Sequence, residues 1–434
     1  MPSPQRRSDI IDALRSGVVP RRGLDVLAVG MERFESAIDE ELESVRAGNG
    51  RFKAVRGEYG SGKTFFARWV EERAKRAGFA VSEVQISETE TPLHKLETVY
   101  RRLMERLSTS DKEQAAFRSI VDAWVYALEE DLLAAGELND QDAPALVART
   151  NELMEKRLAA ITELAPAFSA ALRGYRSAVA SGDNASAEAL LAWVSGQPNV
   201  AVGAKRAAGI KGEIDHFSAL SFLQGLLIML RDAGFAGLIL VLDEVETLQR
   251  VRGDVREKAL NALRQLIDEL LGGRFPGLYL VITGTPAFFD GPQGIKRLPP
   301  LAQRLHADFG SEPRFDNPRA PQIRLRGFDL DSLEDVGRKV RDIYAAGSAA
   351  EGRISELCDD PYIRTLAAAV SGSLGGKVGV APRLFLKKLV GDVLDRVDQF
   401  PDFDPRRHYQ LTLSSAEMTD AERGATVDDI ELQL

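Results

Sequence analysis

One short stretch of this sequence combines the residue types that bind a nucleotide phosphate. It reads Gly57, Glu58, Tyr59, Gly60, Ser61, Gly62, Lys63 and Thr64, and it matches the P-loop pattern G-x-x-x-x-G-K-[ST] at every specified position. Glycines let backbone amides turn inward around phosphate oxygens, and a helix that begins at such a loop adds partial positive charge. We therefore expect Lys63 to reach the β- and γ-phosphates of ATP and the Thr64 hydroxyl to ligate Mg²⁺.

A pair of acidic residues further along the chain supplies the second half of such a site. Asp243 and Glu244 end the apolar run LILVLDE. The carboxyl end of a parallel strand is where ligands of open sheets bind. We expect Asp243 to complete the Mg²⁺ shell and Glu244 to act as general base on the attacking water. Two adjacent acids favour hydrolysis of the bound nucleotide.

The segments around both motifs predict an α/β fold with a parallel sheet. Residues 51–57 read as a strand that ends at the loop, and residues 63–78 return to helical spacing. Because strand-like and helical segments alternate, the sheet should be parallel and buried on both faces. Further strands are predicted at 79–87, 237–248, 277–289 and 321–329.

Changes in composition and turn signals divide the chain into five predicted parts. The extra helical segment inside the core carries no chemical motif, so it suits either recognition of a partner or simple packing. The parts are an N-terminal helical lead-in (1–50), a P-loop core in two pieces (51–109 and 236–328), a helical insertion (110–235), a helical lid (329–398) and an acidic C-terminal tail (399–434).

Composition excludes several classes of protein. The chain of 434 residues has a formal net charge of −9, four histidines and one cysteine, Cys358. A single thiol cannot form an intramolecular disulfide, and the histidines lack the spacing of a metal hydrolase. The negative charge argues against a protein that coats nucleic acid, so any contact with DNA must be local. We expect a cytoplasmic protein with neither signal peptide nor membrane span.

Together the two motifs resemble the AAA+ family of ATPases, over residues 51–395 with the insertion as an interruption. The resemblance implies a polar "sensor 1" residue at the end of the strand that follows the acid pair. In LVITGT this residue is Thr285, with Thr283 as the alternative. A threonine that caps the turn before a proline would look the same.

Three arginines take roles from the same resemblance. Arg304 in LPPLAQRL lies where the family carries an arginine finger, which reaches the γ-phosphate of a neighbouring subunit, and Arg297 is the competing position. Arg383 in GVAPRLFLKKLV resembles the sensor 2 arginine that folds over the bound phosphates. A shared site of this kind implies a homo-oligomer.

Within AAA+, several segments resemble the ATP-binding proteins of bacterial BREX phage-defence systems, of the BrxD kind, which are similar to the origin-recognition and initiator clade. The segments are the lead-in IIDALRSGVVPRRGLDVLAVGMERF, the loop GEYGSGKT, the helical insertion and APRLFL. The resemblance implies an ATPase that acts on or around DNA beside a large helicase, with adenine-pocket candidates at Val19, Pro20 and Val29. Residues 399–434 are too few and too acidic for the winged-helix domain usual in initiators.

The leading hypothesis is therefore an AAA+ ATPase that couples Mg²⁺-dependent ATP hydrolysis to conformational change in a DNA-associated defence complex. A second hypothesis is a nucleotide-dependent switch with little turnover, which gates docking of a helicase or nuclease. A small-molecule kinase is weaker, because it needs an acceptor pocket and basic lid residues soon after the loop. The turnover number in the presence of DNA and partner separates the first two.

Overall fold

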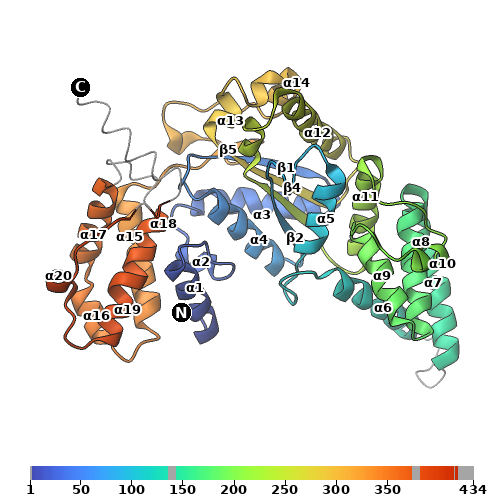
Figure 1. The fold of residues 1–434 in the computed structure, drawn as a ribbon, viewed down its shortest axis with the longest axis horizontal. Helices are drawn as coiled ribbons and strands as arrows, with labels where there is room; N and C mark the ends of the chain where they lie inside the picture. Colours follow the sequence, from blue (N-terminus) through green and yellow to red (C-terminus); the bar gives the residue numbers. More distant parts are fainter. Residues whose placement is uncertain (1, 135–142, 374–381, 415, 419–434) are drawn as a thin grey trace.

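The computed structural model describes residues 2–134, 143–373, 382–414 and 416–418, which fold around a central parallel sheet (Figure 1). Within these residues the sheet has five strands in the order β2-β3-β4-β1-β5, and every neighbouring pair is parallel. This confirms the predicted α/β class and parallel sheet, although the last strand is shorter than predicted. The strands are β1 (Arg51–Arg56), β2 (Ala80–Gln85), β3 (Leu238–Asp243), β4 (Leu278–Gly284) and β5 (Gln322–Arg324).

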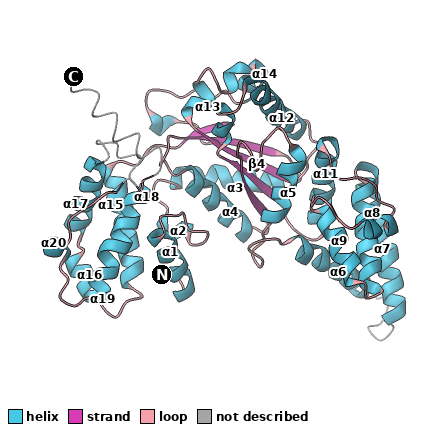
Figure 2. Cartoon of the chain, in the orientation of Figure 1, coloured by secondary structure: helices cyan, strands magenta, loops and turns pink. Residues whose placement is uncertain are grey.

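Both faces of the sheet are buried because alternate strand residues point to opposite sides. In β3, Leu240 packs on one face, whereas Ile239 and Val241 pack on the other. Figure 2 shows the strands lying between helices. The second face is covered by α3 (Glu32–Arg46) and α4 (Lys63–Arg76), and the first by α5 (Leu96–Arg106), α11 (His216–Asp232) and α12 (Gly253–Leu271).

Helices extend the first face of the sheet into a large helical unit between β2 and β3. Its apolar core is continuous with that face, and edge-to-face rings join Tyr100 of α5 to Phe222 of α11, and Phe222 to Phe168 and Trp193. The unit is therefore fastened to the sheet through its core. Between α5 and α11 its helices are α6 (Phe117–Ala134), α7 (Ala143–Leu164), α8 (Pro166–Ala180), α9 (Asn184–Val194) and α10 (Val202–Ala207).

Short helical elements lie on either side of helix α12 and strand β4 in the chain. The element η1 (Val245–Gln249) connects β3 to α12. After β4 come α13 (Pro286–Asp290), η2 (Ile295–Arg297), α14 (Pro299–Arg304) and η3 (Pro313–Phe315), and then β5.

A second helical unit packs against the N-terminal helix on the other side of the sheet (Figure 1). Arg15 of the N-terminal helix forms an ion pair with Asp395, with 2.7 Å between Nε and Oδ2. Tyr409 and Leu411, from the described part of the predicted tail, pack on the same core; residues 419–434 of that tail lie outside the described residues. The helices are α1 (Pro4–Arg15), α2 (Leu24–Leu27), α15 (Leu330–Ala345), α16 (Glu351–Leu357), α17 (Asp360–Ser373), α18 (Pro382–Lys387), the π-helix η5 (Lys388–Leu394), α19 (Asp395–Gln399) and α20 (Pro405–His408).

One strand residue departs from the apolar pattern, because Lys53 in β1 is fully buried. Its Nζ lies 2.6 Å from Oε1 of Glu41 on α3 and donates to the carbonyls of Pro318 and Ala320 at 3.0 and 2.8 Å. Glu41 also accepts from the Tyr279 hydroxyl. Burial lowers the pKa of Lys53, and Glu41 opposes this shift. The ammonium therefore joins β1, α3 and the segment before β5.

We expect Lys53→Met to destabilise the fold by about 3–5 kcal/mol, because it leaves the Glu41 carboxylate without its buried cation. Urea unfolding followed by tryptophan fluorescence measures the change. Lys211→Met, at an exposed lysine, is the matched control. Adding Glu41→Gln to Lys53→Met should recover part of the loss, and unchanged stability of Lys53→Met would contradict a stabilising role for the pair.

Candidate nucleotide-binding site

The glycine-rich loop connects β1 to α4 at the carboxyl end of the sheet. A Cβ added to Gly57 would lie 2.2 Å from Oγ of Ser61, so a larger residue there would require the Ser61 side chain to move. Gly62 has a φ of 87° and precedes the first residue of α4, which lets the loop enter the helix in a left-handed conformation. Tyr59 is 43% exposed at the loop, and Glu58 and Gly60 are also exposed. The context of strand, loop and helix that the motif requires is present.

Lys63 begins α4 and points back over the loop. Its Nζ donates to the carbonyls of Gly57 at 2.9 Å and Glu58 at 3.2 Å, and it lies 5.1 Å from the centre of the Tyr59 ring. The side chain is buried, so the loop itself fixes its position. An ammonium held in this way is aimed at the space that the loop encloses, where a phosphate would replace the carbonyl contacts.

The two motifs meet at one hydrogen bond. Oγ1 of Thr64 donates to Oδ2 of Asp243 at 3.0 Å, across 179 positions of sequence. Asp243 is buried at the end of β3, and its Oδ1 accepts from the hydroxyl of Thr283 on β4. The Thr64 hydroxyl at the start of α4 and the Asp243 carboxylate at the end of β3 form an oxygen donor set that suits Mg²⁺. Among the described residues, no group of three or more His, Cys, Asp or Glu side chains lies close enough together to hold a metal ion.

Glu244 follows Asp243 with a backbone conformation that is rare for its residue type. Its φ is 59°, in the left-handed region, and its amide donates to Oγ1 of Thr283 at 3.1 Å. Its Oε2 accepts from Nε2 of Gln85, at the end of β2, at 2.9 Å. Strained backbone of this kind is commonly found at functional positions. Gln85 therefore holds the carboxylate of the expected general base.

A third carboxylate, which the sequence reasoning missed, lies inside the same site. Glu246 in η1 is 5% exposed, neither of its oxygens has a hydrogen-bond partner, and Oε1 lies 3.8 Å from Nζ of Lys63. Burial raises the pKa of Glu246, and Lys63 opposes this shift. The sequence signal was weak, because Glu246 is one more acid in the turn DEVETL.

Thr283 and Thr285 differ in what they touch. Thr283 is fully buried and contacts both Asp243 and Glu244 through its hydroxyl. Thr285 begins α13, and its carbonyl accepts from the amide of Phe288 at 3.0 Å, but its side chain makes no capping hydrogen bond. The structure thus brings the alternative residue, Thr283, into contact with the acid pair, while Thr285 lies just beyond the strand end.

The arginine-finger candidates lie outside this cluster. Arg304 ends α14, is 43% exposed, and pairs with Asp268 of α12 at 3.0 Å between Nε and Oδ1. Arg297 ends η2, and its Nη1 donates to Oε1 of Gln293 at 3.4 Å. Neither arginine contacts the loop of its own chain among the described residues.

The sensor 2 and adenine candidates contact different parts of the molecule. Nη2 of Arg383 donates to the carbonyl of Glu417 at 2.6 Å, so this arginine faces the described end of the tail. The carbonyl of Val19 accepts from Arg68 of α4 at 2.6 Å, and Pro20 is buried beside it in sequence. Val29 packs against the core of the second helical unit. Among the described residues, none of these contacts joins Val19, Pro20 or Val29 to Lys63.

The comparison with protein families now bears on this geometry. The sequence model of the family described as "BREX system ATP-binding protein BrxC/D" matches residues 3–413. The chain belongs to the BrxC/D family of BREX system ATP-binding proteins. The match includes the glycine-rich loop, the acid pair and the helical units on either side of the sheet. In a comparison with curated proteins, none matched.

The family description implies ATP binding, and the glycine-rich loop, Lys63 and the acids at the end of β3 are the residue types that such binding requires. The sequence resemblance to BREX ATP-binding proteins is thereby confirmed. None of the helices in the described part of the chain is long and apolar enough to cross a membrane.

Proposed function

We propose that this chain is a Mg²⁺-dependent AAA+ ATPase that acts in the bacterial cytoplasm, where it couples ATP hydrolysis to conformational change in a DNA-associated BREX defence complex. The observation that carries the proposal is the hydrogen bond between Thr64 and Asp243, with Glu244 next in sequence. It joins a phosphate-binding loop to an acid pair from a distant part of the chain. Phosphoryl transfer needs those two parts in one place.

Each residue of the cluster takes a role in this proposal. The loop amides and Lys63 bind the phosphates, and Thr64 and Asp243 would hold Mg²⁺, which would supply charge neutralisation for the phosphate oxygens. Glu244 takes a proton from the attacking water. To do so it must leave its hydrogen bond with Gln85. Glu246 balances the charge of Lys63 before ATP arrives.

The strand order supports the AAA+ assignment. Strand β4 lies between β1, which precedes the loop, and β3, which ends in the acid pair. The residues at the end of β4 therefore lie between the two motifs, which is where a sensor of the γ-phosphate is needed. Thr283 occupies that position with a hydroxyl bonded to Asp243, so we now favour it over Thr285 as sensor 1.

The proposed site is shared between subunits. Arg304 lies on the surface away from its own loop, as a residue that completes a neighbouring site must. The shared site makes hydrolysis depend on assembly. A helicase or another defence protein, and DNA, are the partners we propose for the assembled form, and Arg383 would have to exchange the Glu417 carbonyl for a phosphate when the lid closes.

The test of this proposal is ATP turnover across protein concentration, with and without duplex and single-stranded DNA. Turnover per subunit should rise with concentration, and Arg304→Ala should lower it at least about 10-fold because charge stabilisation is lost in the transition state. Mixing Arg304→Ala subunits with Lys63→Ala subunits should restore part of the activity, since each supplies what the other lacks. Arg297→Ala is the rival variant, and a larger loss in Arg297→Ala than in Arg304→Ala would transfer the finger role to Arg297.

The hydrogen bond from Gln85 to Glu244 favours a second candidate function, a nucleotide-dependent switch with little turnover. A carboxylate engaged in this way is not yet a general base. ATP binding with near-stoichiometric turnover in every condition, including DNA, would favour the switch. No recovery of activity in the mixed subunits would contradict the shared site.

A further inference from the structure

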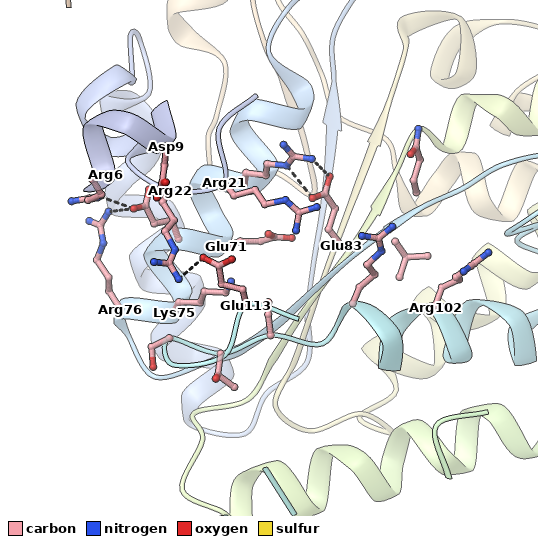
Figure 3. A pocket seen from close by; sticks show the side chains of 18 of the residues that line it. Arg6, Asp9, Arg21, Arg22, Glu71, Lys75, Arg76, Glu83, Arg102 and Glu113 are labelled. Carbon is pink, nitrogen blue, oxygen red and sulfur yellow. Dashed lines mark hydrogen bonds and ion pairs between the residues drawn. The ribbon is translucent and has the colours of Figure 1, made fainter. Parts of the chain in front are cut away.

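A polar cavity of about 840 Å³ (Figure 3) is lined in part by Gln85, which contacts Glu244, but by no residue of the glycine-rich loop. Its walls come from α1, residues 21–22 of the lead-in, the outer side of α4, strand β2 with the loop after it, and the end of α5 with residues 108–113. Residues 57–64, Asp243 and Glu244 are absent from its lining. A cavity of this size accommodates a mononucleotide-sized ligand or a short stretch of a larger one.

Cations outnumber acids in this cleft, although the whole chain has a net charge of −9. The side chains point into it from the lead-in, α4, β2 and α5 (Figure 3). The cations are Arg6, Arg21, Arg22, Arg68, Lys75, Arg76, Arg102 and Arg106, and the acids are Asp9, Glu71, Glu72, Glu83, Glu90 and Glu113. The cleft is thus a local positive site in an acidic protein.

Most of these acids already have partners. Glu72 accepts from the amides of Gly23 and Leu24, at 3.0 and 2.8 Å, and pairs with Arg6. Glu83 pairs with Arg68 at 3.0 Å between Nε and Oε2.

Glu113 pairs with Arg22. Among the described residues, the side chains of Arg21, Lys75 and Arg106 form neither a hydrogen bond nor an ion pair. Three cations therefore remain for a ligand.

Glu71 lines the same cleft as these cations. Its Oε1 is enclosed and has no hydrogen-bond partner. Burial raises the pKa of Glu71 to about 8, and the carboxylate of Glu83 adds to the rise, whereas Lys75 and Arg68 oppose it. Asp243, behind the cleft on β3, raises it slightly. Burial also lowers the pKa of Lys75, and the Glu71 carboxylate opposes this shift, so these two side chains titrate together.

The lining also indicates which part of a ligand is recognised. It contains arginine, lysine, serine and threonine side chains but, within the described residues, no aromatic ring on which a base could stack. Arginine in particular binds phosphate through two parallel hydrogen bonds. We propose that this cleft is a second anion site, which binds the phosphate groups of a ligand through Arg21, Arg106 and Lys75, separately from the P-loop.

Two sources could supply such phosphates, the backbone of a DNA duplex or a small phosphate compound. The test is fluorescence anisotropy with a labelled duplex of about 20 base pairs, the full chain and no nucleotide, over a series of salt concentrations. Wild type is compared with Arg21→Gln/Arg106→Gln, which removes two exposed cations without breaking any ion pair. The matched control is Arg314→Gln/Arg407→Gln, which changes the net charge equally at exposed sites outside the cleft.

The cleft variant should bind the duplex at least about 10-fold more weakly, and its plot of log K against log salt should be shallower by about 1.8, since each lost phosphate contact contributes about 0.9. The control should stay within about twofold of wild type. Pyrophosphate titrated into Lys63→Ala, with and without the cleft substitutions, tests the small-ligand source. Binding of only this probe, lost in the cleft variant, identifies a small phosphate compound.

Binding of neither probe, or equal losses in the cleft and control variants, would overturn the proposal. The inference does not rest on hydrolysis. If the protein never hydrolyses ATP but binds a duplex through Arg21 and Arg106, the anion-site proposal holds and only the proposed ATPase activity is contradicted.

Discussion

Replacing Lys63 with alanine is expected to lower kcat/KM for ATP by roughly 100- to 1,000-fold. The substitution removes the only side-chain cation on the loop, so no ammonium stabilises the negative charge of the phosphates. ATP should also no longer raise the melting temperature, since binding to the native state is what shifts unfolding. Coupled-assay turnover and thermal unfolding with and without Mg²⁺–ATP measure the two effects.

Lys258→Ala, at an exposed lysine of α12, is the control and should retain both properties. The melting temperature of Lys63→Ala without nucleotide separates lost function from lost folding, because Glu246 would lie buried without its neighbouring cation. If Lys63→Ala kept its full melting shift with ATP, the loop would not be the nucleotide site.

Glu244→Gln is expected to lower kcat by roughly 100- to 10,000-fold while leaving the affinity for ATP within about threefold of wild type. An amide of the same shape cannot accept the proton of the attacking water, but it leaves Lys63, Thr64 and Asp243 in place. Single-turnover hydrolysis and equilibrium binding of labelled ATP, measured on the same preparation, separate the two quantities.

Two variants decide whether Glu244 is the residue responsible. Glu257→Gln, at an exposed glutamate of α12, should hydrolyse ATP as fast as wild type. Glu246→Gln is the informative rival, because this buried carboxylate lies 3.8 Å from Lys63 and has no hydrogen bond. A Glu246→Gln protein that loses hydrolysis while Glu244→Gln keeps it would transfer the general-base role to Glu246.

Much of the fold was predictable from local patterns. The continuous apolar runs before Asp243 and around residue 280 require burial on both faces, and only a parallel sheet between helices provides it. Residues 63–78 keep helical spacing directly after the glycines, so the loop must lie between a strand and a helix. The two chemical motifs are short and contiguous in sequence, and their residue types leave few alternatives.

Other features depend on contacts between distant segments. Lys53 reads as a polar interruption of a strand, and only the approach of Glu41 and two carbonyls from residues 318–320 explains its burial. The cleft draws its cations from four separate segments, so no stretch of sequence looks basic enough to reveal it. Such sites form only when the chain has folded.

The sequence by itself determined the glycine-rich loop between a strand and a helix, the acid pair at a strand end and the parallel sheet, because each is fixed by residue types and spacing within a short stretch of chain. Only the tertiary structure decided that Thr283 and not Thr285 touches Asp243, that Gln85 holds Glu244, and that Glu246 lies beside Lys63. The reason is physical: these side chains come from separate strand ends, from the turn after β3 and from the start of α4, and which of them meet depends on strand order and register.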